Sequence, residues 1–175
     1  MLSEAGIFER NNNLSKCTGI KSIQIFSHDL TNSGEVEVTR KCSGGWMLIN
    51  GIEAHKMYTK APGYDLVAVN IKDKKSISIQ VKSRYQTGVG HFIIKNFESD
   101  YVAIVLLNRG YAKPRKNGDK GIKEPEIYLV PTKVIKSAQD PNDAWNKVSL
   151  SKIPNLESYR DNLGILKKEL GVLNA

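Results

Sequence analysis

The alternation of hydrophobic and polar residues predicts a β-hairpin over residues 63–82. A β-branched run at 65–69 is followed by a polar turn at 70–75 and by a strictly alternating segment at 76–82. In the second strand Ile77, Ile79 and Val81 share one face, which leaves Ser78, Gln80 and Lys82 on the other. This hairpin is the best-defined unit that the pattern predicts.

Two further strands follow the hairpin. Residues 101–107 are apolar at every position, which is typical of a central strand covered by helices on both faces. Residues 126–130 predict another strand, which ends before Pro131. The segment between them, 111–120, is basic and contains Pro114 and Gly118, so it is predicted to be a loop.

Helices are predicted upstream and downstream of these strands. Asn32 and Glu35 have the spacing of a capping box, and the helix that they start is expected to stop at Gly44 and Gly45. The apolar run 46–49 suits a short buried strand, and residues 50–62 form a less regular connection. Leucines and Tyr159 at three-and-four spacing predict an amphipathic helix over 156–170.

The chain is therefore interpreted as a polar arm over residues 1–30, within which 20–26 could form an edge strand, and one domain over 31–175. The order of helices and strands in that domain predicts an α/β (α+β) fold, with a central mixed β-sheet flanked by helices. A length of 175 residues suits a single core of this kind.

Charge narrows the list of partners. The chain has 26 lysines and arginines against 18 acids, a formal net charge of +8 and a pI near 9.4. Such a balance favours a polyanionic partner such as nucleic acid, although many basic proteins bind none. We expect this positive charge to be concentrated where DNA would lie.

The compartment is expected to be cytoplasmic, with no membrane partner. The two cysteines, Cys17 and Cys42, lie 25 residues apart and make neither a disulfide framework nor a zinc ribbon. No apolar run approaches the roughly 20 residues of a membrane span, and residues 1–6 lack the pattern of a signal peptide.

The predicted hairpin also brings three side chains together that could act in catalysis. Asp65 opens its first strand, and antiparallel pairing would place this carboxylate beside Gln80 and Lys82 of the second strand. A carboxylate and an amide oxygen are ligands that Mg²⁺ accepts, and a nearby ammonium can position a water and offset negative charge. The three side chains would suit phosphodiester hydrolysis assisted by a metal ion.

The segment from Pro62 through Asp65 to Gln80-Val81-Lys82 resembles the signature of the PD-(D/E)xK nuclease superfamily, in the variant with glutamine at the middle acid. The resemblance covers about residues 30–130. It implies a restriction endonuclease-like core, in which a helix precedes a three-stranded meander, and a metal-dependent DNA endonuclease activity. Gly63 and Tyr64 separate Pro62 from Asp65, which departs from the usual spacing.

Carried over residue by residue, the resemblance implies that Asp65 is the principal metal ligand and Lys82 the catalytic lysine, with Gln80 at the middle position. Glu35 would be the acid from the helix, and the main-chain carbonyl of Val81 a further ligand. The metal would be Mg²⁺, with Mn²⁺ able to substitute. Replacement of the middle acid by Gln80 removes one negative charge and would weaken metal binding.

Candidate DNA contacts follow the hairpin and occupy the basic loop. They are Ser83, Arg84, Tyr85, Arg115 and Lys116. Each of the proposed site residues also has a structural interpretation: Gln80 and Lys82 could belong to a solvated strand face, and Glu35 could serve only the capping box.

Three hypotheses remain open at this point. The first is a magnesium-dependent deoxyribonuclease, expected to act as a homodimer or larger assembly because two strands are cut. The second is a nucleic-acid-binding module or accessory subunit that keeps the fold without catalysis. The third is a protein-interaction domain whose charge serves only solubility.

Overall fold

A computed structural model describes residues 43–57 and 63–172. The predicted arm, the strand expected at 20–26 and Glu35 with the start of its helix lie outside the described residues. The strands are β1 (Glu53–Lys56), β2 (Leu66–Asn70), β3 (Lys75–Arg84), β4 (His91–Ile93), β5 (Tyr101–Leu106), β6 (Glu126–Pro131) and β7 (Lys147–Ser149). The helices are α2 (Thr132–Ala138), α3 (Gly164–Leu170), the short 3₁₀ turns Leu150–Lys152 and Leu156–Tyr159, and a helix containing residues 43–49.

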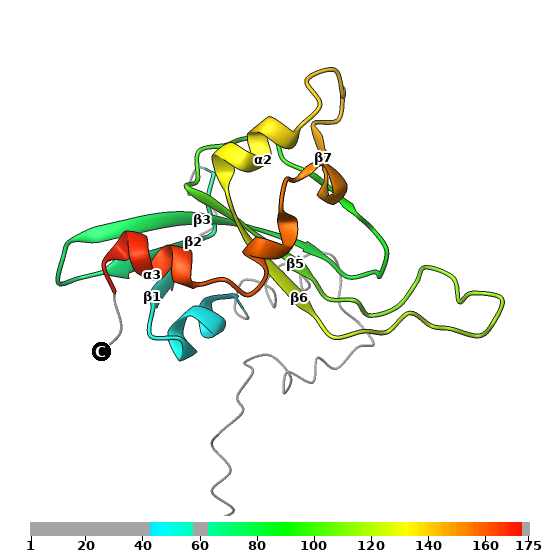
Figure 1. Ribbon diagram of the computed structural model, residues 1–175, viewed down its shortest axis with the longest axis horizontal. Helices are drawn as coiled ribbons and strands as arrows, with labels where there is room; N and C mark the ends of the chain where they lie inside the picture. The colour runs from blue at the N-terminus through cyan, green and yellow to red at the C-terminus, as the bar shows by residue number, and fades with distance from the viewer. Residues whose placement is uncertain (1–42, 58–62, 173–175) are drawn as a thin grey trace, which may run out of the picture.

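Five strands form one mixed sheet in the order β1-β2-β3-β5-β6 (Figure 1). The central pair β3 and β5 runs parallel, with Gln80 opposite Val102, and the other neighbours are antiparallel. Strands β4 and β7 form a separate two-stranded sheet. The predicted fold class, an α+β domain on a mixed sheet, is confirmed.

The hairpin and the two downstream strands are also confirmed. Strands β2 and β3 pair with Val67 opposite Ser78, and their turn is held by the Oδ1 atom of Asn70, which accepts from the backbone N–H groups of Lys72 and Asp73. The apolar strand β5 is buried on both faces, as its composition predicted. Residues 111–120 form a connection without regular secondary structure, as expected.

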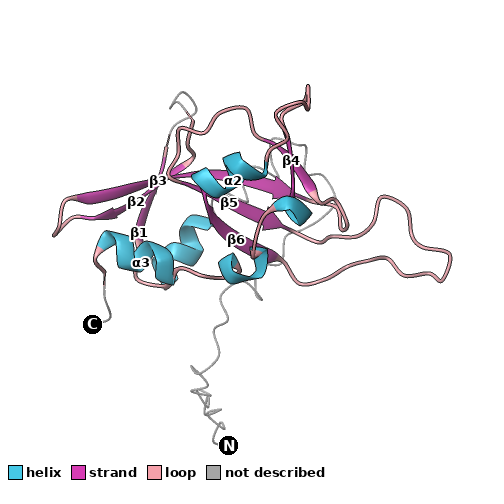
Figure 2. Cartoon of the chain, turned by 45° about the horizontal axis from the view of Figure 1, so that its top comes forward, coloured by secondary structure: helices cyan, strands magenta, loops and turns pink. Residues whose placement is uncertain are grey.

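Two hydrophobic cores lie on the two faces of the sheet. The first contains Ile79 and Val81 of β3 together with Leu166 and Leu170 of α3. The second contains Val102 and Ile104 of β5 with Ile135 of α2 and residues of β4 and β7. Figure 2 shows the helices distributed about the sheet. Burial of each large side chain stabilises the fold by about 1.5–3 kcal/mol.

The strand predicted at 46–49 is wrong, because these residues are helical. Trp46 and Met47 are buried, whereas Leu48 and Ile49 are 55% and 68% exposed, and an apolar run with one exposed side fits a helix turn better than a buried strand. The predicted stop at Gly44 and Gly45 is wrong for the same reason.

The helix ends instead at Gly51, which has a positive φ of 76°. The N–H of Ile52 donates to the carbonyl of Met47 at 2.9 Å, and the N–H of Gly51 donates to that of Leu48 at 3.0 Å. This is a Schellman motif, which satisfies the last carbonyls of a helix. Glycine is needed here because its missing Cβ permits the left-handed conformation.

Two other predictions need correction. The connection at 50–62 contains β1, an edge strand whose mostly exposed residues give no hydrophobic alternation. The C-terminal helix is interrupted: a 3₁₀ turn at 156–159 is separated from α3 by Arg160, which bridges to Tyr128 of β6, and by Asp161, whose φ is +48°. Leu163, Leu166 and Leu170 nevertheless enter the core as the spacing predicted.

Candidate active site

Asp65 lies directly before β2 and is held against β3 by both its backbone and its side chain. Its N–H donates to the carbonyl of Ile79 at 2.9 Å. Its Oδ2 atom accepts from the N–H of Val81 at 2.7 Å, so the carboxylate extends the ladder of hydrogen bonds beyond the start of β2. If the β2–β3 register is continued by one residue, Asp65 lies opposite Gln80, as the sequence pattern predicted.

Gln80 is the buried polar residue of this region, with 8% of its surface exposed. Its Nε2 atom donates to Oδ1 of Asn96 at 3.4 Å, but its Oε1 atom is buried without a hydrogen-bond partner. A buried carbonyl oxygen left unsatisfied costs about 1–3 kcal/mol. The position therefore favours a ligand or water that binds Oε1.

Lys82 follows two residues later on β3 and is half-buried. The alternation that sends Ile79 and Val81 into the first core leaves Gln80 and Lys82 on the opposite face, as predicted. The structure therefore brings Asp65, Gln80 and Lys82 to one end of the hairpin. Because the N–H of Val81 donates to Asp65, the backbone of Val81 lies beside the same carboxylate.

A second chain segment, 96–98, borders this region and was missed by the sequence analysis. Gly63 has a φ of +75°, and a Cβ atom placed there would lie 2.5 Å from Oε2 of Glu98 and 3.2 Å from Oδ1 of Asn96. The chain entering Asp65 thus packs tightly against Asn96 and Glu98. No motif marks these two residues, since only the tertiary fold brings them to the hairpin.

The residues present suit a hard divalent cation. Among the described residues, no three His, Cys, Asp or Glu side chains gather into a metal-binding group. The donors at the hairpin are the carboxylate of Asp65 and the unpartnered carbonyl oxygen of Gln80. Two such oxygens match the needs of Mg²⁺, which retains several waters. Glu35, the other predicted acid, lies outside the described residues.

The predicted DNA contacts after Lys82 fall into two environments. Arg84 lies on the Gln80 face, where its Nε atom donates to the carbonyl of His91 at 3.0 Å and its guanidinium lies 4.9 Å from the ring centroid of Phe92. Tyr85 instead packs against the first core. By alternation, the side chain of Ser83 also lies on the face of β3 that packs against the first core, opposite to the Gln80 face.

Arg115 and Lys116 are exposed in the connection between β5 and β6. The guanidinium of Arg115 lies 4.5 Å from the ring centroid of Tyr111, a cation–π distance. These two residues are not beside Asp65. They lie beyond the C-terminal end of β5, where Leu106 pairs with Arg84 of β3.

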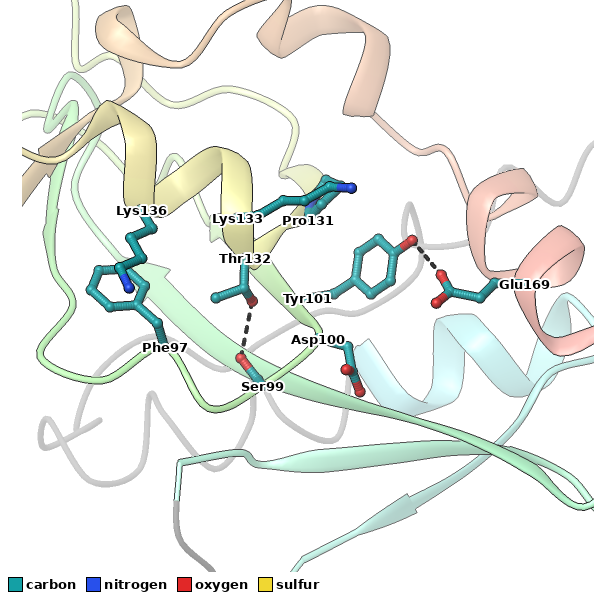
Figure 3. A pocket seen from close by; sticks show the side chains of 9 residues that line it. All are labelled: Phe97, Ser99, Asp100, Tyr101, Pro131, Thr132, Lys133, Lys136 and Glu169. Atoms are coloured by element: carbon teal, nitrogen blue, oxygen red, sulfur yellow. Dashed lines mark hydrogen bonds between the residues drawn. The ribbon is translucent and has the colours of Figure 1, made fainter.

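A cavity of about 460 Å³ lies at the other end of β5, between α2 and α3 (Figure 3). The hydroxyl of Tyr101 donates to Oε2 of Glu169 at 2.7 Å, and the hydroxyls of Ser99 and Thr132 lie 3.3 Å apart. Burial, followed by the hydrogen bond to Glu169, raises the pKa of Tyr101 well above its ordinary value of 10.0. The cavity does not include Asp65, Gln80 or Lys82.

Comparison with known proteins adds a structural relationship. No protein-family model and no curated protein sequence matches this chain. Within the described residues no helix has the length and apolar character that crossing a membrane requires. Among solved structures, the chain is similar to the bacterial homing endonuclease I-Ssp6803I, with a TM-score of 0.50 and 14% sequence identity, over 81% of this chain and 95% of that one. At this identity the likeness concerns the fold, which is therefore one that a homing endonuclease also adopts.

Proposed function

We propose that this protein is a metal-dependent DNA endonuclease of the PD-(D/E)xK type, with glutamine at the middle position. The observation that carries the proposal is the buried, unpartnered Oε1 atom of Gln80 on the strand that holds the Asp65 carboxylate. The fold shared with a homing endonuclease and the net charge of +8 support DNA as the substrate.

In the proposed site Asp65, the Oε1 atom of Gln80 and the main-chain carbonyl of Val81 would hold Mg²⁺, with Glu35 as a fourth donor. The ion would supply Lewis-acid stabilisation of the negative charge that develops on the phosphoryl oxygens. Lys82 orients the attacking water and offsets charge in the transition state. Asn96 positions Gln80 by accepting from its Nε2 atom, which leaves Oε1 to face the ion.

Glutamine in place of an acid lowers the negative charge of the site by one unit. A weaker metal site is therefore expected, and cutting should depend on a higher Mg²⁺ concentration than a site with an additional carboxylate would need. We expect a homodimer or larger assembly, because cutting both strands of a duplex takes two sites.

The test is DNA cleavage by the purified full chain with Mg²⁺ or Mn²⁺, using supercoiled plasmid, branched and single-stranded DNA. The informative variants are Asp65→Asn and Lys82→Ala, compared with Lys72→Ala in the exposed hairpin turn. We expect the first two to lose at least about a hundredfold in rate, the low end for removal of a group that acts in the transition state, and the third to cut normally.

Cleavage that is unaffected by Asp65→Asn and Lys82→Ala would reject this site. A wild-type protein that binds DNA with strong salt dependence but cuts none of the three substrates would favour the non-catalytic binding module instead. The substitution of an acid by Gln80 is the feature of the chain that fits this second function.

A further inference from the structure

The connection between β5 and β6 forms a projecting two-stranded arm, which we call the basic ribbon and define as residues 109–122. Arg109 and Ile122 pair as an antiparallel bridge at its base. Further out, the N–H of Tyr111 donates to the carbonyl of Lys120 at 2.9 Å. Near the tip, the N–H of Arg115 donates to the carbonyl of Asp119 at 3.0 Å. Figure 1 and Figure 2 both show this arm extending away from the sheet.

The direction of the basic ribbon is fixed at its base by Thr87, a buried residue that follows β3. The hydroxyl of Thr87 donates to the carbonyl of Gly121 at 2.6 Å and accepts from the N–H of Gly110 at 3.2 Å. The N–H of Thr87 donates to the carbonyl of Gly110 at 2.9 Å. One side chain thus ties both strands of the ribbon to the chain that leaves Arg84.

Tyr111 packs so closely on Gly121 that no larger residue fits there. A Cβ atom at Gly121 would overlap the ring of Tyr111, and the φ of Gly121 is +70°. The guanidinium of Arg115 covers the same ring. The backbone of the ribbon is therefore held as a defined arm, and the guanidinium of Arg115 is held on the ring of Tyr111, which lowers the entropy lost on binding.

Positive charge is concentrated on this arm. Residues 109–122 contain five cations (Arg109, Lys113, Arg115, Lys116 and Lys120) and one acid (Asp119), a net charge of +4 out of +8 for the whole chain. Asp119 uses its Oδ1 atom to accept from the N–H of Gly121 at 2.8 Å. Within the described part of the chain, no ion pair joins Lys113, Arg115 or Lys116 to a carboxylate.

The base of the ribbon lies at the end of β3 that follows Gln80 and Lys82. Gln80 and Arg84 are four positions apart, a distance of ~13 Å along a strand. Arg84 pairs with Leu106, and the ribbon begins three residues later. A DNA duplex has a turn of ~34 Å, so a duplex placed at Asp65 and Gln80 can extend to the ribbon within one turn.

We propose that the basic ribbon clamps duplex DNA, with Lys113, Arg115 and Lys116 contacting phosphates on either side of the major groove. Like a two-stranded β-ribbon, which has the width to enter that groove, the arm consists of two antiparallel chain segments joined by backbone hydrogen bonds. Exposed cations gain affinity by releasing counterions from phosphates. This inference rests on the proposed function and deepens it. The ribbon supplies affinity and orientation, whereas Asp65, Gln80 and Lys82 supply the chemistry.

The experiment compares two variants that each remove three positive charges. The ribbon variant carries Lys113→Gln, Arg115→Gln and Lys116→Gln. The control carries Lys72→Gln and Lys74→Gln in the turn of the hairpin and Lys75→Gln at the first residue of β3, where the side chains are also exposed. Dissociation constants for a fluorescent duplex are measured by anisotropy without metal between about 50 and 200 mM salt, the range over which binding to phosphates weakens most visibly. Thermal unfolding of both variants reports any loss of folding.

We expect the ribbon variant to bind about tenfold or more weakly than wild type at low salt. Its salt slope should be reduced by about 2–3, because each phosphate that is no longer neutralised lowers the slope by about one. The control should bind within about twofold of wild type, because exposed charges remote from the DNA contribute little.

Equal binding by the ribbon variant and the control, in a wild-type protein that binds and cuts DNA, would overturn the ribbon proposal and leave the proposed function standing. A wild-type protein that neither binds nor cuts any DNA would overturn both. A ribbon variant that binds normally but cuts slowly would also reject the clamp, since the ribbon would then act in the chemistry.

Discussion

Gln80 donates a hydrogen bond from Nε2 to Oδ1 of Asn96, 3.4 Å away, while its own Oε1 atom stays buried without a partner. The bond joins the hairpin to the segment that precedes β5. Because an amide nitrogen can only donate, Asn96 determines which end of the Gln80 side chain carries the open acceptor. The unpartnered oxygen and the Asp65 carboxylate are the two oxygen donors of the proposed site, and variants can separate their chemical role from their effect on stability.

Gln80→Glu should strengthen metal binding and weaken the metal-free fold. The added carboxylate would be buried and would face the Oδ1 acceptor of Asn96, so its pKa should rise above the ordinary value of ~4.3. The free energy of unfolding should therefore fall by about 1–3 kcal/mol as the pH rises above ~4.3, because the folded protein then has to bury a charged group. Mg²⁺ should restore that loss. Thermal unfolding at acid and neutral pH, with and without Mg²⁺, measures both effects.

Gln80→Leu is the matched control for this position. It removes the orphaned oxygen without adding charge, so the metal-free protein should be as stable as wild type or more stable. Mg²⁺ should no longer raise its melting temperature. A stabilising response to Mg²⁺ that survives Gln80→Leu would mean that Gln80 does not bind the ion.

Asp65 is expected to have separable structural and chemical roles. Asparagine keeps a side-chain oxygen that can accept from the N–H of Val81, whereas alanine leaves that N–H without its 2.7 Å partner. Asp65→Ala should therefore destabilise the fold by about 1–2 kcal/mol, and Asp65→Asn by less. Urea denaturation of the two variants tests this order. Equal stability losses would show that the hydrogen bond to Val81 contributes little.

Thr87→Val should loosen the basic ribbon without unfolding the sheet. Valine matches the shape of threonine but cannot bond the carbonyl of Gly121 or the N–H of Gly110. We expect faster hydrogen exchange across residues 109–122, unchanged exchange in β3 and β5, and a loss of about 1–2 kcal/mol in local opening energy. Thr87→Ser retains the hydroxyl and should exchange as wild type. Protection of the ribbon that persists in Thr87→Val would show that Thr87 does not fix its direction.

Stability should decline above pH 10, the ordinary value for tyrosine. Burial raises the pKa of Tyr101 and of Tyr128 above 10.0, with Glu169 and Glu126 adding to the effect. In the unfolded chain these hydroxyls lose their protons near pH 10, whereas the folded protein retains them, so alkaline conditions favour unfolding. Denaturant unfolding between pH 8 and about 11 measures the slope.

Tyr101→Phe should flatten part of that alkaline decline. It also removes the hydrogen bond to Glu169, so stability at neutral pH should fall by about 1 kcal/mol. The difference between variant and wild type should therefore shrink as the pH rises. A constant difference across the range would contradict the raised pKa of Tyr101.

The sequence was most informative where one face of an element is buried and the other is not. Strict alternation located β3 and placed Gln80 and Lys82 on one face, because a strand has a period of two. The continuous apolar run of β5 was recognisable because both of its faces are covered. The same reasoning failed at Trp46 and Met47, since four apolar residues are too few to distinguish a strand from a helix turn.

Elements without a hydrophobic pattern could not be predicted. Strand β1 is an edge strand with largely exposed side chains, and its pairing with β2 depends on the backbone. Asn96 and Glu98 lie against the hairpin through tertiary contacts, among them the tight approach at Gly63, which no local pattern encodes. The hairpin members of the proposed site were visible in sequence, whereas the segment that orients Gln80 was not.

The pairing of β4 with β7 has a consequence for the order in which the protein folds. Phe92 pairs with Val148, and the N–H of Ile94 donates to the carbonyl of Asn146 at 3.1 Å, so the segment leading to Asn96 is anchored by residues more than fifty positions later. Closing a loop of that length costs about 3–4 kcal/mol of chain entropy, and such long-range pairings form late. During synthesis, the hairpin carrying Asp65 and Gln80 can form long before β7 is made, whereas the anchoring of Phe92 and Ile94 by β7 and Asn146 can follow only afterwards.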